Sequence, residues 1–245
     1  MQRLYVIGIG PGGAECLTIQ AQDALVESQA IVGYTEYVKL IEGLCAGKQV
    51  ISTGMMKEIE RCRAALELAQ EGKTTAMVCS GDAGVYGMAS PILELSPEYP
   101  QVDVVVISGV SAAQSGSAVL GAPISHDFAV ISLSDLRTPW ELIERRLHAA
   151  GQADFCVIIY NPQSKKRKDH LHNAAKILLE YKSPETVCGW VRMIGREGQE
   201  HGFLTLDELQ THDVDMFTTV FVGNERTRII NGRMVTPRGY DSKAR

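Results

Sequence analysis

The chain has 245 residues, and 45% of them are hydrophobic, so it can bury the core of one large domain or of two compact ones. Its 24 Lys and Arg residues are outnumbered by 29 Asp and Glu, which gives a formal net charge of −5. This balance excludes a global basic field, and we expect no nucleic-acid partner. No apolar run reaches the roughly 18 residues of a membrane span, and no signal-peptide pattern is present. We therefore expect a cytoplasmic protein with no membrane partner.

The cysteines and histidines predict no metal site. The six cysteines are scattered without a C-x-x-C pair, which is typical of reduced, mostly buried thiols rather than of a zinc or disulfide framework. His170 and His172 are two residues apart on an expected helix, so their side chains point to different faces.

Strand-like and helix-like segments alternate through the first half of the chain. Short apolar runs predict strands and amphipathic runs predict helices. In chain order these are a strand at 4–9, a helix at 18–29, a strand at 30–33, a helix at 59–71, a strand at 75–79, a helix at 88–95, a strand at 102–107 and a small-residue segment at 111–120. The alternation predicts a mostly parallel sheet covered by helices.

A second series follows the break at Gly121-Ala122-Pro123. It comprises a strand at 128–133, helix at 139–149, strand at 155–160, helix at 170–181, and strands at 187–191 and 218–222. We therefore expect two α/β domains, residues 1–124 and residues 125–245.

Glycine-rich loops follow three of the predicted strands of the first half. Residues 8–13 have the G-x-G-x-x-G spacing of dinucleotide-binding proteins, but Pro11 removes a backbone donor and the next convincing helix begins only near Thr18. A tight turn after a buried strand is the alternative. The second and third loops are residues 79–87 and 108–113. Open α/β sheets bind ligands at such strand ends, so the three loops together predict a small-molecule site.

Asp82 is the one charged residue of the second loop. Its carboxylate is suited to pair with an amine or a sulfonium centre, and the alternative is that it only caps the helix that follows.

Motifs run in one order through essentially the whole chain and resemble a known family. They are Gly8-Ile9-Gly10-Pro11-Gly12, Ser80-Gly81-Asp82-Ala83-Gly84-Val85-Tyr86-Gly87-Met88-Ala89, His126-Asp127-Phe128, Ile131-Ser132-Leu133-Ser134-Asp135-Leu136, Thr138-Pro139-Trp140, Tyr160-Asn161-Pro162, Thr218-Thr219-Val220, Val222-Gly223-Asn224 and Thr236-Pro237-Arg238-Gly239-Tyr240. In these motifs the sequence resembles the tetrapyrrole methyltransferases of cobalamin biosynthesis, most closely their C17 branch. The family's common Gly-Gly-Asp-Pro loop is Ser80-Gly81-Asp82-Ala83 here, a departure that the C17 branch shares.

The resemblance implies a fold, a reaction and a set of contacts. It implies the two-domain tetrapyrrole methylase fold, in which each domain is a mixed sheet flanked by helices and the active-site cleft lies between the domains, usually in a homodimer. It implies S-adenosylmethionine-dependent methylation at C17 of precorrin-3B or cobalt-factor III, with ring contraction. The cofactor contacts that it implies are Pro11, Gly81, Asp82, Val85, Tyr86, Ser111, Ala112, Leu133, Asn161 and Met193.

The acid and base of the reaction are not transferred from the family. Related uroporphyrinogen methyltransferases carry an Asp after the second strand and a Lys after the third, where this chain has Gly33-Tyr34-Thr35-Glu36 and Thr53-Gly54-Met55-Met56. His126, Asp127 and Ser132 are our candidates for proton transfer, because their segment opens the second domain. The alternative is that His126 and Asp127 form only a hydrogen-bonded domain junction.

A substrate with many carboxylates requires a local basic lining in an acidic protein. Lys165, Lys166 and Arg167 follow the Asn161-Pro162 turn and are the candidates for this lining, although a solvated surface run is the alternative. Two other functions remain open at this point. The first loop is compatible with an NAD-dependent oxidoreductase, and the whole chain with a non-catalytic tetrapyrrole-binding protein.

Overall fold

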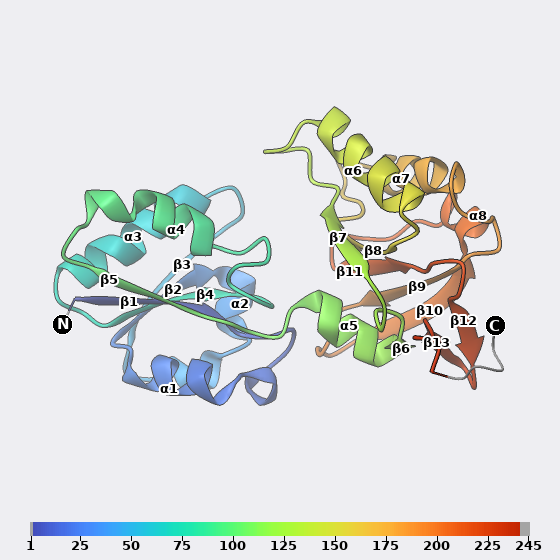
Figure 1. The fold of residues 1–245 in the computed structure, drawn as a ribbon. Coiled ribbons are helices and arrows are strands. Elements are labelled where there is room, and N and C mark those ends of the chain that lie inside the picture. The colour runs from blue at the N-terminus through green and yellow to red at the C-terminus, as the bar shows by residue number, and fades with distance from the viewer. Residues whose placement is uncertain (1, 241–245) are drawn as a thin grey trace. The chain divides into compact units, whose positions relative to one another are not determined.

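The computed structural model describes residues 2–240, which form two compact units, one ending at Ala112 and one beginning at Ala113. We call them unit 1 and unit 2, and Figure 1 shows each as a sheet with helices on both faces. No helix among residues 2–240 is both long enough and apolar enough to span a membrane.

The sheet of unit 1 is parallel throughout, with the strand order β3-β2-β4-β1-β5. The strands are β1 (Arg3–Gly8), β2 (Ala30–Tyr34), β3 (Gln49–Thr53), β4 (Thr75–Cys79) and β5 (Asp103–Ile107). Because all five strands point the same way, their carboxyl ends meet at one edge of the sheet, which we call the carboxyl edge of unit 1.

Helices cover both faces of this sheet because successive side chains of its central strands point alternately into two apolar layers. Leu4 and Val6 of β1 face a layer that includes helices α3 (Glu58–Gln70) and α4 (Ala89–Leu95). Tyr5 and Ile7 face the opposite layer, with α1 (Ile19–Glu27) and α2 (Thr35–Lys39). Strands buried on both sides in this way give the near-continuous apolar runs that the sequence showed.

The sheet of unit 2 has the order β10-β9-β11-β8-β7 and is mixed. Only β7 and β8 pair in parallel, and the other neighbours are antiparallel. Its strands are β7 (Phe128–Ser132), β8 (Cys156–Tyr160), β9 (Val187–Arg192), β10 (Glu200–Thr205) and β11 (Thr218–Val222). A small second sheet joins β12 (Arg228–Ile230), β13 (Arg233–Val235) and β6 (Gly121–Ala122). The predicted α/β fold class is confirmed, and the mixed sheet belongs to unit 2 alone.

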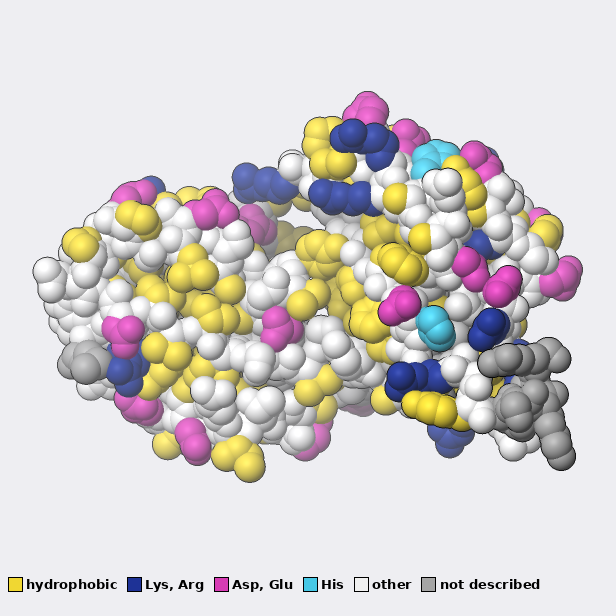
Figure 2. Space-filling model, in the orientation of Figure 1, with side chains coloured by type: hydrophobic (Ala, Val, Ile, Leu, Met, Phe, Trp, Pro, Cys, Tyr) yellow, Lys and Arg dark blue, Asp and Glu magenta, His cyan; other side chains and the backbone are white. Residues whose placement is uncertain are grey.

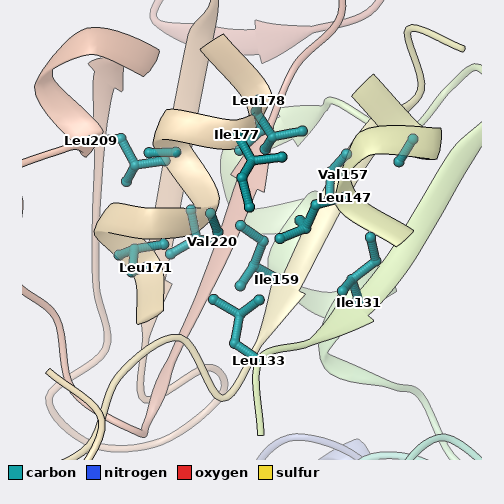
Figure 3. Close-up of a cluster of buried hydrophobic side chains, with 14 of the residues drawn as sticks. Ile131, Leu133, Leu147, Val157, Ile159, Leu171, Ile177, Leu178, Leu209 and Val220 are labelled. Carbon is teal, nitrogen blue, oxygen red and sulfur yellow. The ribbon is translucent and has the colours of Figure 1, made fainter. Parts of the chain in front are cut away.

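One face of the unit 2 sheet carries its main apolar core. Figure 3 shows Ile159 and Val220 of the sheet meeting Leu171 and Leu178 of the helix above, and all four side chains are buried. The helices on this face are α6 (Trp140–Gln152), α7 (His170–Leu179) and α8 (Leu206–Leu209).

Helix α5 (Ala112–Leu120) packs on unit 2, on the other face of its sheet. A Cβ atom on Gly116 would lie 2.8 Å from the ring of Phe221, so only glycine allows this close approach. The sequence pattern breaks at Gly121, which suggested a domain boundary between residues 124 and 125. In the structure this segment forms β6 and pairs with β13 inside unit 2. This packing is the reason why the two units divide before α5, at residues 112 and 113.

Candidate functional site

Three glycine loops are hydrogen-bonded to one another at the carboxyl edge of unit 1. After β1, the Gly10 amide donates to the Gly81 carbonyl at 3.0 Å, and the Gly81 amide donates back to Gly10 at 2.7 Å. After β5, the Gly109 amide donates to the Asp82 carboxylate at 2.9 Å. The loops after β1, β4 and β5 are therefore one connected structure.

Glycine is required where these loops cross. A Cβ atom on Gly8 would lie 2.6 Å from the Gly81 carbonyl oxygen and 2.7 Å from the Gly109 amide nitrogen. A Cβ atom on Gly109 would overlap the same Gly81 oxygen. Gly81 itself has a φ of +67°, a conformation that side chains rarely adopt. The excess of glycine is thus explained in part by backbone-to-backbone contact at this edge.

The Asp82 carboxylate holds its own loop in shape. Its Oδ1 accepts hydrogen bonds from the amides of Gly84 at 2.8 Å and Val85 at 3.1 Å, while Oδ2 accepts from Gly109. The following helix α4 begins only at Ala89, so Asp82 ties two loops together instead of capping that helix.

The predicted cofactor residues of unit 1 lie on these three loops, except that Ala112 is the first residue of α5. Val85 and Tyr86 are exposed by 38% and 54%, and Tyr86 has a positive φ of 54°. Ser111 is buried beside Gly81, with its Cα 3.6 Å from the position that a Gly81 Cβ would take. The structure therefore brings together the seven residues Pro11, Gly81, Asp82, Val85, Tyr86, Ser111 and Ala112.

Cys79, the last residue of β4, lies beneath the second loop as a neutral thiol. Burial raises its pKa to about 12, and its Sγ accepts a hydrogen bond from the Met88 amide at 3.4 Å. Such a thiol is inert as a nucleophile at neutral pH. All six cysteines are free, and four of them are buried, as the sequence predicted.

A second group of predicted residues lies at the carboxyl ends of β7, β8 and β9 in unit 2. The Asn161 side-chain amide donates to the Ser132 hydroxyl at 2.9 Å, and the Leu133 amide donates to the Tyr160 carbonyl at 2.9 Å. Asn161 and Met193 both have positive φ angles, of 52° and 53°. The Leu133 side chain is fully buried in the core, so only its backbone faces this edge.

The three candidates for proton transfer are not brought together. His126 and Asp127 precede β7, whereas Ser132 is its last residue, and the extended chain from Asp127 to Ser132 spans about 16 Å at 3.3 Å per residue. Both His126 and Asp127 are exposed, and the His126 Nδ1 accepts a hydrogen bond from the Asp127 amide at 2.9 Å. Their geometry is that of a local turn before the strand.

The basic segment after β8 divides into two exposed lysines and one anchored arginine. Lys165 and Lys166 lie at the tip of a turn closed by paired backbone hydrogen bonds between Ser164 and Arg167. The Arg167 side chain is only 12% exposed and donates to the Ser134 hydroxyl at 2.6 Å. Arg167 therefore fixes the loop after β7 to the loop after β8.

Sequence reasoning missed further basic residues of unit 2. Figure 2 shows dark-blue side chains gathered over α6 and the loop before it. Arg137 precedes α6, Arg145 and Arg146 are part of it, and all three are exposed. Arg137 follows β7 and thus lies at the same edge as Lys165. A count of charge along the loop after β7 would have found it.

These features define a class of protein. Glycine loops that meet at the carboxyl edge of a parallel sheet, with exposed side chains around them, are the small-molecule site of an open α/β protein. The residues at this edge are suited to hold an organic cofactor through backbone groups. Among residues 2–240, no group of three or more His, Cys, Asp or Glu side chains is placed to hold a metal ion.

Comparison with known proteins identifies the family. The family model of the tetrapyrrole (corrin/porphyrin) methylases matches residues 3–210. The chain belongs to this family and is a methyltransferase.

Two curated relatives and one solved structure illustrate the match. The chain is 48% identical to a probable cobalt-factor III C(17)-methyltransferase of Salmonella typhimurium, over 97% of this chain and 99% of the relative. It is 35% identical to a precorrin-3B C(17)-methyltransferase of a Sinorhizobium species, over 97% and 96%. The crystal structure of the methyltransferase CobJ has a TM-score of 0.89 at 35% identity, covering 96% of this chain and 99% of that one.

The fold recurs in more distant proteins. A uroporphyrin-III C-methyltransferase of Thermus thermophilus, solved in complex with S-adenosylhomocysteine, has a TM-score of 0.71 at 20% identity and covers 90% of this chain and 97% of that one. The predicted tetrapyrrole methylase fold is thus confirmed.

Proposed function

We propose that this chain is an S-adenosylmethionine-dependent methyltransferase that methylates C17 of a tetrapyrrole in cobalamin biosynthesis, with contraction of the macrocycle. The observation that carries the proposal is the set of three interlocked glycine loops at the carboxyl edge of unit 1. It occurs in a chain 48% identical, over nearly its whole length, to a relative named for this reaction.

The loops of unit 1 fit an adenosyl cofactor. Gly81 and Gly84 leave space for backbone groups to approach a ligand, and Val85 and Tyr86 present exposed apolar surface beside them. The proposed contacts are Pro11, Gly81, Asp82, Val85, Tyr86, Ser111 and Ala112 in unit 1, and Leu133, Asn161 and Met193 in unit 2. A sulfonium cofactor supplies an electrophilic methyl group when it is bound.

Methyl transfer requires alignment more than it requires acid or base. The electron pair of the ring carbon forms the new carbon–carbon bond, the sulfur–methyl bond breaks, and its electron pair stays on the sulfur of the thioether product. The task of the protein is to hold both molecules in line and to exclude water. Rigid loops, fixed by Asp82 and by glycine contacts, suit this task.

Cobalt-factor III is the substrate that we favour over precorrin-3B. The identity to the cobalt-factor III relative is 48%, against 35% to the precorrin-3B relative, at similar coverage. Lys165, Lys166 and the anchored Arg167 are proposed to face the carboxylates of the macrocycle, and Arg137 adds a cation at the same edge. We also propose that the enzyme acts in the cytoplasm as a homodimer.

The oxidoreductase alternative loses its support in the structure. The third glycine of the first loop is followed by a three-residue 3-10 turn (Ala14–Cys16), and α1 begins only at Ile19. The first loop therefore does not lead directly into the N-terminus of a helix, as a dinucleotide pyrophosphate would require.

The test is transfer of a labelled methyl group. The purified protein is incubated anaerobically with methyl-labelled S-adenosylmethionine and with either cobalt-factor III or precorrin-3B, and the product masses are compared. We expect one labelled methyl on the tetrapyrrole, formed faster with cobalt-factor III. Tight pigment binding without transfer would instead indicate a binding protein, and a faster reaction with precorrin-3B would reverse the substrate assignment.

A further inference from the structure

Arg61 is a buried cation without an ionic partner. It lies in the first turn of α3 and is only 5% exposed. Among residues 2–240 just one other charged side chain, Lys182, is buried to a similar degree, and it forms an ion pair with Asp154 at 2.7 Å. Arg61 forms no ion pair with any carboxylate of residues 2–240.

The known partners of the Arg61 guanidinium are all neutral. Its Nε donates to the Thr53 hydroxyl at 2.8 Å, and its Nη2 donates to the Gly54 carbonyl at 2.9 Å. Its Cζ lies 5.8 Å from the centre of the Tyr34 ring. Nη1 makes no hydrogen bond within residues 2–240. The buried side-chain nitrogens and oxygens without a partner do not include it, so Nη1 is in contact with solvent.

The local field does not compensate this charge. The first turn of a helix carries the positive end of the helix dipole, which disfavours a cation. Glu58 and Glu60 share this turn with Arg61, but Glu60 pairs with Lys57 at 3.1 Å and neither forms an ion pair with Arg61. A guanidinium stays protonated, and its burial is costly unless an anion joins it. The site is thus arranged to receive an anion.

The position of Arg61 indicates which anion. Thr53 and Tyr34 end strands β3 and β2 at the carboxyl edge of unit 1, the edge that also carries the glycine loops. Strands lie about 4.8 Å apart, so β3 ends about 10 Å from the loop after β4, on the side away from β1 and β5. This distance sets Arg61 apart from the proposed cofactor loops.

The loop that Arg61 holds presents apolar side chains to solvent. Met55 and Met56 are exposed by 49% and 79%, directly after Gly54. Methionine side chains adapt to flat apolar surfaces. A cation beside an exposed apolar loop matches a macrocycle that has an apolar face and carboxylates at its rim.

We infer that Arg61 binds a carboxylate of the tetrapyrrole substrate, through its free Nη1, at the ends of β2 and β3. This inference rests on the proposed function and adds to it a substrate contact outside the basic segment after β8. Arg61 is a binding residue, and no step of the methyl transfer is assigned to it.

The experiment measures binding of two ligands to each variant by calorimetry. The ligands are S-adenosylhomocysteine and cobalt-factor III, together with a derivative of the latter whose carboxylates are amidated. We expect Arg61→Gln to weaken binding of cobalt-factor III about 10- to 100-fold, the range for a hydrogen-bonded charge pair. Binding of S-adenosylhomocysteine should stay unchanged, and the amidated ligand should bind the variant and the wild type equally.

A matched control lies on the same helix. Arg63 is two residues further on and pairs with Glu98 at 2.7 Å on the surface, so Arg63→Gln should leave the affinity for both ligands unchanged. Arg61→Lys keeps the charge but loses the planar donors, and it should give an intermediate loss. If Arg61→Gln does not fold, Arg61→Lys still tests the inference.

Two results would overturn this inference and leave the proposed function standing. In the first, the Arg61 variants bind cobalt-factor III as well as the wild type does. In the second, they lose affinity for S-adenosylhomocysteine and for the amidated ligand to the same extent, which would show a purely structural role. A wild-type protein that binds cofactor product but no tetrapyrrole would overturn the proposed substrate, and this inference with it.

Discussion

The crossing of Gly8, Gly81 and Gly109 offers a direct test of the cofactor site. The substitution Gly109→Ala adds one methyl group at the point where the loops after β1, β4 and β5 meet. The new Cβ would overlap the Gly81 carbonyl oxygen and lie 2.5 Å from the Gly8 carbonyl oxygen. Ordinary van der Waals contact begins at 3.4 Å, so the distance between the new Cβ and the Gly8 carbonyl oxygen must grow by 0.9 Å.

The cost follows from overpacking of a rigid contact. Inserting a methyl group into a well-packed region costs about 1–3 kcal/mol when the neighbours must shift. Both neighbours here are backbone carbonyls, which cannot rotate away. If the loops separate to make room, the Gly109 amide also moves from its 2.9 Å hydrogen bond with Asp82. We therefore expect the affinity for S-adenosylhomocysteine to fall about 10- to 100-fold, which corresponds to about 1.4–2.8 kcal/mol.

Calorimetry with S-adenosylhomocysteine and thermal melting measure this effect. Gly43→Ala is the matched control, because a Cβ at Gly43 meets nothing within 4 Å and its φ needs no glycine. The control should bind and melt like the wild type. If Gly109→Ala binds the cofactor product with wild-type affinity, the loops do not form the site and the reasoning is refuted.

Three further predictions concern Asp82, the basic segment and a buried thiol. Asp82→Asn replaces one acceptor oxygen by a donor that faces a backbone amide, so affinity for S-adenosylhomocysteine should fall about tenfold in calorimetry; unchanged affinity would show that this carboxylate is dispensable. Replacing the exposed Lys165 and Lys166 by Ala should weaken tetrapyrrole binding without lowering the melting temperature, whereas Arg167→Ala should lower it because the Ser134 contact is lost; unchanged tetrapyrrole affinity would remove the two lysines from the site. Burial raises the pKa of Cys79 to about 12, so the unfolded thiol ionises above its ordinary pKa of 9.0 while the folded one stays neutral. The free energy of unfolding should therefore fall between pH 9 and 12, by up to about 1.4 kcal/mol per pH unit for this group. Denaturant unfolding at several pH values measures this, and in Cys79→Ala the free energy of unfolding should fall less steeply with pH.

The central strands could be predicted from the sequence because burial on both faces leaves an apolar run. The strands at 75–79 and 218–222 have the predicted bounds, and their residues are buried throughout. The edge strands β3 and β10 were missed, because each is partly exposed and carries polar residues such as Ser52 and Glu200. Period-two patterns fade where a strand has only one neighbour and little core to face.

The candidate site shows a similar limit. Glycine spacing at strand ends predicted the three loops, because these positions are decided by the local chain and by the sheet. Arg61 could not be predicted as buried, since an arginine on an amphipathic helix is normally exposed and its neutral partners Thr53 and Gly54 carry no charge signal. Contacts between segments that are distant in sequence decide its burial.

Three of the predicted cofactor residues have a strained backbone conformation. Tyr86, Asn161 and Met193 have φ angles of 52° to 54°, and within residues 2–240 three other non-glycine residues have a positive φ. Asparagine tolerates this conformation, but tyrosine and methionine do so only at a cost of about 1–3 kcal/mol. A protein keeps such a cost where the surrounding structure enforces it, and such sites cluster at ligand-binding positions. If the strain serves the ligand, Tyr86→Gly should stabilise the protein and weaken binding of S-adenosylhomocysteine; a variant that is more stable and binds equally well would show that the strain is unrelated to the cofactor.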